Sequence, residues 1–142
     1  MSTYLGLDYG ERRIGVACSD ELHRFSEPLK ILDAKSPQLL SELSDLISEF
    51  NVCELVVGIP KRTGGEIKSE AERVLRFVHS LKKKISCPIV TWDERFTTKI
   101  ADQILDEANI KQENRKGKRD AVAAAVMLQG YLDFKRLGNQ HV

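Results

Sequence analysis

The sequence predicts a mixed β-sheet with helices on both of its faces. Two strand-like segments joined by a tight turn open the chain, and later strands alternate with helices. A hairpin contributes antiparallel strands, whereas βα alternation adds parallel ones. The 142 residues are the size of one ordinary domain, and no repeat or linker-like composition divides them. We therefore treat residues 1–142 as one unit.

Three strands are expected near the start of the chain. Tyr4–Asp8 and Arg13–Cys18 are short, β-rich segments that flank a turn at 9–12, which is the pattern of a hairpin. Phe25–Leu32 is a third strand. Because its Pro28 cannot donate to a ladder of hydrogen bonds, this strand belongs at an edge of the sheet.

A helix and a buried strand come next. Ser36 and Pro37 have the character of an N-cap and a first helical residue, and apolar residues recur at helical spacing over Leu39–Phe50. Val52–Ile59 is an almost continuous apolar run. Such a run is typical of a strand that is covered on both faces, so we expect it inside the sheet.

The remaining elements are a strand and three helices. A helix is expected over Glu66–Lys84, a strand over Pro88–Trp92, and then a helix capped by Thr97 or Thr98. The last helix runs from about Asp120 to Arg136, and its alanines allow close packing on a sheet. The apolar stripe of the helix over Glu66–Lys84 contains Ala71, Val74, Leu75, Val78 and Leu81. The buried side of the last helix contains Ala121, Ala123, Ala124, Ala125, Met127, Leu128, Tyr131 and Leu132.

Composition excludes several classes of protein. No apolar run approaches the ~18 residues of a membrane span, and the first residues lack the pattern of a signal peptide, so we expect a cytoplasmic protein with no membrane partner. Three well-separated cysteines fit small buried hydrophobes in a reducing compartment. A net charge of +1 argues against capture of a polyanion by the whole surface.

Two stretches are nevertheless basic. Between Lys61 and Lys84 there are eight basic residues and three acids, and between Lys111 and Arg119 there are five and one. Such stretches can bind a phosphate backbone, although a solvated helix face and a solubilising loop are the alternative. We expect the second stretch, which contains Gly117, to be a mobile loop. The candidate nucleic-acid contacts are Arg12, Lys61, Arg62, Arg95, Arg115, Lys116, Lys118 and Arg119.

Three acidic residues stand at element boundaries. Asp8 closes the first strand, Glu94 follows the fifth, and Asp120 opens the last helix. If these strands are neighbours and the helix crosses their ends, the carboxylates converge where open sheets bind ligands. Oxygen ligands select Mg²⁺ or Mn²⁺ over zinc, and two such ions can activate a water and stabilise a leaving oxyanion in phosphodiester cleavage. Spacing alone leaves open that each acid is a cap or a surface charge. It also leaves open whether Glu94 or its neighbour Asp93 enters the site, because adjacent residues of a strand point to opposite faces.

Longer motifs bear on these alternatives. The segment Leu5–Ala17, LGLDYGERRIGVA, closely resembles the opening of the YqgF family, also called the RuvX-type Holliday junction resolvases. Further blocks agree in the same order, namely Leu55–Pro60 with Gly64 and Gly65, Asp93–Thr98, and Asp120–Ala125 with Leu128–Leu132. The resemblance covers nearly the whole chain, and four blocks in order make a specific match.

The resemblance implies a single RNase H-like nuclease domain over residues 1–142. Its sheet would have five strands, with the second antiparallel to the others, and flanking helices. The family's acidic positions fall on Asp8, Glu94 and Asp120, which implies a hydrolase with a two-metal Mg²⁺ or Mn²⁺ site. The implied substrate is the end of the 16S rRNA precursor in ribosome biogenesis, with association to a ribosomal subunit, and Holliday junction DNA is the alternative. Monomer and homodimer both stay open.

Two rivals from other classes also stay open. A strand with Asp-x-Gly followed by a hairpin also opens the ATP-binding domains of actin and sugar kinases. Those enzymes close two similar domains over the nucleotide, and 142 residues supply one. The second rival is a non-catalytic RNA-binding factor with the same fold, against which the intact acids argue.

Overall fold

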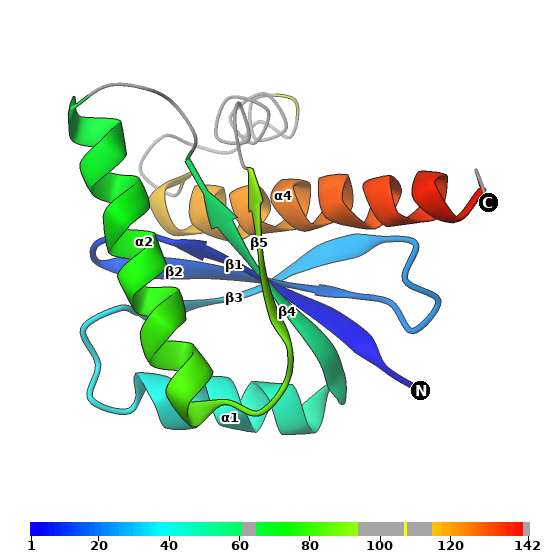
Figure 1. The fold of residues 1–142 in the computed structure, drawn as a ribbon, viewed down its shortest axis with the longest axis horizontal. Coiled ribbons are helices and arrows are strands. Elements are labelled where there is room, and N and C mark those ends of the chain that lie inside the picture. Colours follow the sequence, from blue (N-terminus) through cyan, green and yellow to red (C-terminus); the bar gives the residue numbers. More distant parts are fainter. Residues whose placement is uncertain (61–64, 94–106, 108–114, 141–142) are drawn as a thin grey trace.

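The structure is a computed structural model that describes residues 1–60, 65–93, 107 and 115–140 (Figure 1). Within them, the sheet has five strands in the order β3-β2-β1-β4-β5. The strands are β1 (Thr3–Tyr9), β2 (Arg13–Ser19), β3 (Ser26–Asp33), β4 (Val52–Ile59) and β5 (Ile89–Asp93). Strand β2 pairs antiparallel with both neighbours, whereas β1, β4 and β5 pair in parallel. The predicted mixed sheet, with its second strand reversed, is confirmed.

Strands β1 and β2 form the predicted hairpin. Its turn is closed by the amide of Gly10, which donates to the carbonyl oxygen of Arg13 at 2.9 Å. Strand β3 is an outer strand, as Pro28 requires, and the register of its pairing with β2 shifts beside that proline, between Val16 and Ala17. A missing amide donor therefore fixes the place of β3 in the sheet.

Strand β4 lies inside the sheet, between β1 and β5. Leu55, Val56 and Val57 are fully buried, although successive side chains point to opposite faces. Both faces of β4 are therefore covered, as the apolar run predicts. In parallel neighbours the carboxyl ends meet at one edge, so the C-terminal residues of β1, β4 and β5 lie together there.

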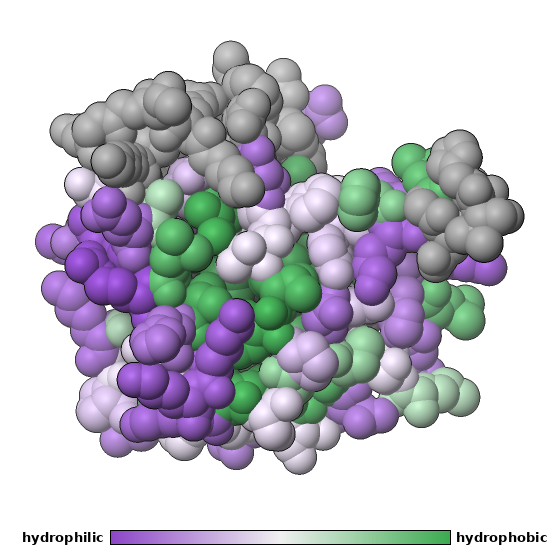
Figure 2. Space-filling view, viewed as in Figure 1, coloured by the Kyte–Doolittle hydropathy of each residue, from purple (hydrophilic) through white to green (hydrophobic). Residues whose placement is uncertain are grey.

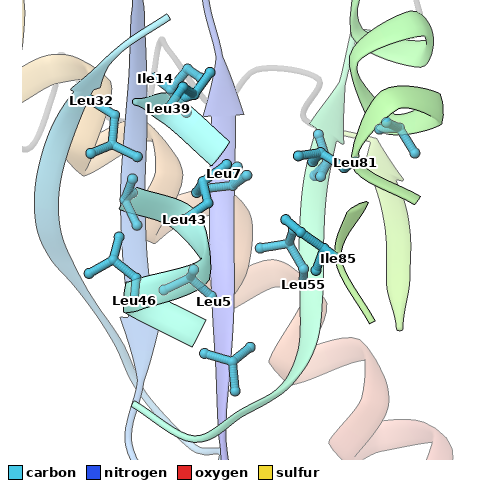
Figure 3. Close-up of a cluster of buried hydrophobic side chains, with 14 of the residues drawn as sticks. Leu5, Leu7, Ile14, Leu32, Leu39, Leu43, Leu46, Leu55, Leu81 and Ile85 are labelled. Carbon is cyan, nitrogen blue, oxygen red and sulfur yellow. The ribbon is translucent and has the colours of Figure 1, made fainter. Parts of the chain in front are cut away.

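Helices cover the two faces of the sheet. Helices α1 (Leu39–Glu49) and α2 (Gly65–Lys84) lie on one face, and α4 (Arg115–Gln140) lies across the other (Figure 1). The α1/α2 face is filled by large aliphatic side chains, with leucines of α1 directed at those of β1 (Figure 3). The α4 face combines alanines and aromatic rings with a few larger aliphatic side chains. Its buried members are Ala17, Val56, Ala124, Ala125, Met127, Leu128, Tyr131 and Leu132.

Two expectations about the first helices are wrong. Helix α1 has Gln38 as its N-cap residue rather than Ser36. The Ser36 hydroxyl instead accepts from the Gln38 amide at 3.1 Å, so it stabilises the turn before the helix. On α2, Leu75 is 50% exposed, because the buried positions Val74 and Val78 are one full turn apart and Leu75 lies about 100° beyond the first of them.

The start of the last helix also differs from expectation. Helix α4 begins at Arg115, so residues 115–119 are helical rather than a loop, and Asp120 lies beyond the first turn. Gly117 costs a helix about 1 kcal/mol relative to alanine, which the packing of a 26-residue helix offsets. The expected helix after Thr97 and the segment 111–114 lie outside the described residues.

The surface of the described residues varies in polarity. Hydrophobic side chains gather in the middle of the face shown in Figure 2, where Figure 1 places β5. Ile89, Val90 and Trp92 of this outer strand are partly buried, and they pack against the two hydrophobic clusters. No helix in the described part of the chain has the length and apolar composition that crossing a membrane requires.

Candidate functional site

Asp8 lies near the C-terminal end of β1 and is half-buried. Its neighbours in the strand fix the face that it occupies. Leu7 belongs to the cluster under α1 and α2, whereas a Cβ built on Gly6 would lie 3.0 Å from the Cβ of Leu128 in α4. Alternation along the strand therefore puts Asp8 on the α4 face, as the sequence predicts.

Asp120 reaches the same place from α4. Gly15 of β2 is the direct partner of Asp8 across the β1–β2 ladder. A Cβ added at Gly15 would lie 1.9 Å from the carbonyl oxygen of Asp120, so the backbone of α4 rests on the backbone of β2 at this point. Asp8 and Asp120 are thus brought together around Gly15, one beside it in the sheet and one above it.

Asp93 is the last residue of β5 and pairs with Ile59. The preceding Trp92 packs on the α4 face, where its ring lies 5.4 Å from that of Tyr131. Alternation therefore directs Asp93 to the face opposite α4. Glu94, the third candidate acid, lies outside the described residues.

The candidate nucleic-acid contacts are only partly described. Arg12 is an exposed residue of the β1–β2 turn. Lys61, Arg62 and Arg95 lie outside the described residues. For the second basic stretch the structure gives only the backbone, which is helical at the four candidate positions Arg115, Lys116, Lys118 and Arg119.

Arg13 is a residue that the sequence reasoning missed. Its Nε donates to Oδ2 of Asp120 at 2.9 Å, in an ion pair between residues 107 positions apart. Arg13 and Gly15 share the α4 face of β2, since they are two residues apart. The sequence held a signal for the neighbouring Gly15, because a glycine inside a strand marks a close approach of another backbone, but none for the Arg13–Asp120 pair itself.

Two hollows flank the β1–β2 turn. The first, of about 230 Å³, opens between the ends of β1 and β4 and the helix α2. Within it, an Arg73 guanidinium nitrogen lies 3.6 Å from a Glu11 carboxylate oxygen. The second, of about 290 Å³, lies on the α4 side of the turn. The first is lined by Asp8, Tyr9, Gly10, Glu11, Pro60, Glu70, Arg73 and Val74, and the second by Gly10, Glu11, Arg12, Arg13 and Asp120.

The donor atoms at the site are carboxylate oxygens. Asp8 and Asp120 together suit a hard divalent cation better than zinc, which prefers nitrogen and sulfur ligands. Among the residues that can be placed, no cluster contains three His, Cys, Asp or Glu side chains. The two aspartates therefore fit a cation site that needs a further ligand.

A buried polar pair lies further along the α4 face. The Tyr131 hydroxyl donates to the carboxylate of Glu54 in β4. Burial raises the pKa of the Tyr131 phenol above its usual value, and the hydrogen bond and charge of Glu54 raise it further. The phenol therefore stays protonated at neutral pH. Burial likewise raises the thiol pKa of Cys18 and of Cys87, which fits the prediction that the cysteines act as small hydrophobes.

Relatives of known name match almost the full length of the chain. A protein of Halothermothrix orenii named "Putative pre-16S rRNA nuclease" is 40% identical over 132 residues, which are 92% of this chain and 94% of the relative. A protein of the same name from Desulforamulus reducens is 42% identical over 130 residues, which are 91% of this chain and 95% of the relative.

Solved structures with a similar fold are junction resolvases. RuvC of T. thermophilus in complex with a Holliday junction substrate has a TM-score of 0.59 at 16% identity, with 97% of each chain covered. The Fowlpox virus resolvase in complex with junction DNA has a TM-score of 0.53 at 12% identity, covering 93% of this chain and 97% of the resolvase. These likenesses confirm the RNase H-like fold. Residues 2–134 match the model of the family described as RuvX, Holliday junction resolvase, and the chain therefore belongs to this family.

Proposed function

We propose that this chain is a divalent-metal-dependent nuclease that hydrolyses phosphodiester bonds of structured nucleic acid, as a single domain over residues 1–142. The observation that carries the proposal is the approach of Asp8 and Asp120 around Gly15, at the carboxyl edge of the sheet. Asp120 is also paired with Arg13, and the two neighbouring carboxylates offer oxygen ligands of the kind that a hard divalent cation prefers.

Asp8, Glu94 and Asp120 would hold Mg²⁺ or Mn²⁺. Glu94 directly follows β5, whose C-terminal end lies at the same edge as that of β1. Asp93 is directed away from α4, which favours Glu94 as the third ligand. When bound, a pair of such cations lowers the pKa of an attacking water and stabilises the leaving oxygen.

The chain's own basic residues would bind the substrate. Arg12 and Arg13 line the hollow beside Asp120, and Arg73 lines the hollow beside Asp8. Their charges offset the repulsion between the carboxylates and a polyanion, so the phosphate backbone can approach the acids. The basic helix start at residues 115–119 precedes Asp120 directly and would extend this positive surface.

The favoured substrate is the end of the 16S rRNA precursor. The names of relatives about 40% identical over more than nine-tenths of the chain support this choice. The description of the family supports a four-way DNA junction as the second candidate. Junction resolution needs two active sites to cut two strands and therefore a homodimer, whereas trimming an RNA end needs one. An rRNA-processing role would also bring the protein to a ribosomal subunit in the cytoplasm.

The test compares both substrates in one experiment. The full chain is incubated with labelled 16S precursor RNA and with a labelled four-way DNA junction, in Mg²⁺, in Mn²⁺ and in EDTA. Cleavage of the RNA is expected with either metal and not in EDTA. Asp8→Asn and Asp120→Asn should each lower the rate by about 100-fold or more, since cation stabilisation of the transition state is worth several kcal/mol. Asp45→Asn, at an exposed carboxylate on α1, is the matched control and should cut like the parent.

Each other outcome identifies a rival. Preferential cutting of the DNA junction by a dimeric protein would indicate that junction DNA, and not the RNA precursor, is the substrate. RNA binding without cleavage in any metal would indicate a non-catalytic RNA-binding factor, and saturable ATP binding without nucleic-acid affinity would indicate a phosphoryl-transfer domain. Equal rates for the parent and both aspartate variants would contradict the proposed mechanism.

A further inference from the structure

Arg13 is held by Asp120 through one edge of its guanidinium group. The Nε atom donates to Oδ2 of Asp120 at 2.9 Å, and the two side chains are 34% and 24% exposed. A guanidinium carries five N–H donors in a planar fork. The contact through Nε leaves the Nη edge of the fork for a different partner, and Asp120 is the one partner that the described residues supply.

The backbone on which this ion pair stands is fixed from several sides. The amide of Gly10 donates to the carbonyl oxygen of Arg13, and Arg13 pairs with Asp33 in the β2–β3 ladder. The amide of Ala34 donates to the carbonyl oxygen of Arg12 at 2.9 Å. Asp120 is fixed in turn, since its own backbone rests on Gly15. Both ends of the Arg13–Asp120 pair therefore start from rigid positions.

The pair lines a hollow that adjoins the candidate cation site. This hollow of about 290 Å³ is bounded by the β1–β2 turn and by Asp120, and Arg12 and Arg13 both contribute to it. Gly10, which lines this hollow, is two residues from Asp8 along the chain. An anion in this hollow would therefore lie beside the two aspartates.

Stabilisation of the fold is a weak explanation for the pair. Ion pairs that solvent still reaches stabilise a fold only weakly, because the charges are screened and the side chains lose freedom, and both side chains of this part-buried pair remain partly exposed. An arginine that a carboxylate already orients loses less freedom when it binds a second anion. Phosphate oxygens match the spacing of the guanidinium fork and form charge-assisted hydrogen bonds with it.

We propose that Arg13, oriented by Asp120, is the residue that binds the phosphate group next to the bond that is cut. This inference rests on the proposed function and adds to it a substrate-binding residue. Asp120 would then have two roles, since Oδ2 orients Arg13 and the other carboxylate oxygen would be available to hold a cation. The ligand is a phosphodiester of the nucleic-acid backbone, bound without reading a base.

The test separates a forked contact from a simple charge. Arg13→Gln removes both the charge and the fork, whereas Arg13→Lys keeps the charge alone. Arg136→Gln is a matched control, because Arg136 forms a 3.0 Å pair with Asp133 on the same helix, outside both hollows. Binding of labelled 16S precursor RNA is measured by fluorescence anisotropy over a range of salt concentrations, in EDTA and in Ca²⁺, and thermal melting verifies that each variant folds.

Arg13→Gln should weaken binding by about 10- to 100-fold, as expected for a lost charged hydrogen bond of about 1.5–3 kcal/mol. It should also reduce the slope of log affinity against log salt by about 0.7–0.9. Arg13→Lys should keep the parent's slope and still bind about 10-fold more weakly, because an ammonium group cannot fork. Arg136→Gln should bind like the parent.

Two results would overturn the inference. One is parent-like affinity and salt slope for Arg13→Gln. Absence of RNA binding by the parent would overturn the inference in the same way, because Arg13 would then bind no phosphate. The other is full rescue of affinity by Arg13→Lys. Cleavage measured in parallel distinguishes this failure from that of the proposed function. A parent that binds RNA through Arg13 but cuts nothing contradicts the nuclease alone, and a parent that cuts as fast as Arg13→Gln contradicts the role of Arg13 alone.

Discussion

The two faces of the sheet are packed in different ways. Under α1 and α2 the strands present large side chains, such as Leu5 and Leu7, which meet leucines of α1. Under α4 the same strands present Gly6 and Gly15, and the helix brings a run of alanines. Large side chains hold a helix away from the sheet, whereas small ones let the two backbones touch. The aliphatic face supplies buried area, and the small-residue face brings Asp120 to Asp8.

The largest loss of stability is expected on the aliphatic face. Leu7 is fully buried, and Leu7→Ala should lower the free energy of unfolding by about 2–5 kcal/mol, because it removes apolar contacts and leaves a cavity. Urea denaturation measures this change. The protein that remains folded should keep its rate of RNA cleavage, since Leu7 is directed away from α4. A large loss of rate per folded molecule would contradict the division between the faces.

Gly15→Ala should damage the small-residue face. The new Cβ would lie 1.9 Å from the Asp120 carbonyl oxygen and 2.4 Å from its carbon, so the helix must move away from β2. Overpacking of this kind costs about 1–3 kcal/mol of stability. Cleavage should fall further than the fraction of folded protein does, because Asp120 is displaced from Asp8. Urea denaturation and cleavage assays measure the two effects. Parent-like stability and cleavage for Gly15→Ala would show that neither the fold nor the site needs the close approach of α4 to β2.

Gly130→Ala should have the opposite sign. On the same helix, a Cβ at Gly130 would meet its nearest neighbour, Nε1 of Trp92, at an ordinary 3.5 Å. Alanine is favoured over glycine inside a helix by about 0.8–1.0 kcal/mol, so the variant should be more stable by about 0.5–1 kcal/mol. A higher midpoint of urea denaturation with an unchanged cleavage rate is expected. Destabilisation would mean that α4 touches the sheet along its whole length.

Alkaline pH should reveal how the buried Tyr131–Glu54 pair of the α4 face affects stability. The folded state raises the pKa of Tyr131 above the value of 10.0 that applies when the phenol is exposed. Below pH 10 the phenol is protonated in both states, so the stability linked to it is fully present there. Above pH 10 the unfolded state releases this proton first, and stability falls as pH rises towards the folded pKa. Tyr131→Phe should show a shallower alkaline decline in thermal melting temperature, and an equal decline would contradict burial as the cause.

Most of the fold could be predicted from local patterns. The apolar run of β4, the hairpin turn and Pro28 at the outer strand each carry their own physical reason. The predictions failed where distant packing decides, as at the start of α4. There Gly117 and the surrounding charges favour a loop locally, yet the structure continues as helix from Arg115.

The site could be predicted only in part. Asp8 and Asp120 were identified as residues, and the family resemblance grouped them. Their approach depends on Gly15, which marks a close backbone contact in the sequence but does not say that α4 makes that contact. Arg13 was missed because its partner lies 107 positions away in the chain, and no local pattern couples a strand residue to a helix at that separation.

The most direct test of the account is a Mn²⁺ titration of the full chain by isothermal calorimetry. We predict saturable binding to the parent and to Asp45→Asn, with the affinity strongly reduced in Asp8→Asn, Glu94→Gln and Asp120→Asn. Each of these three variants removes one charge from a shared set of oxygen ligands. Equal Mn²⁺ affinity in the parent and in all three variants would contradict a common cation site.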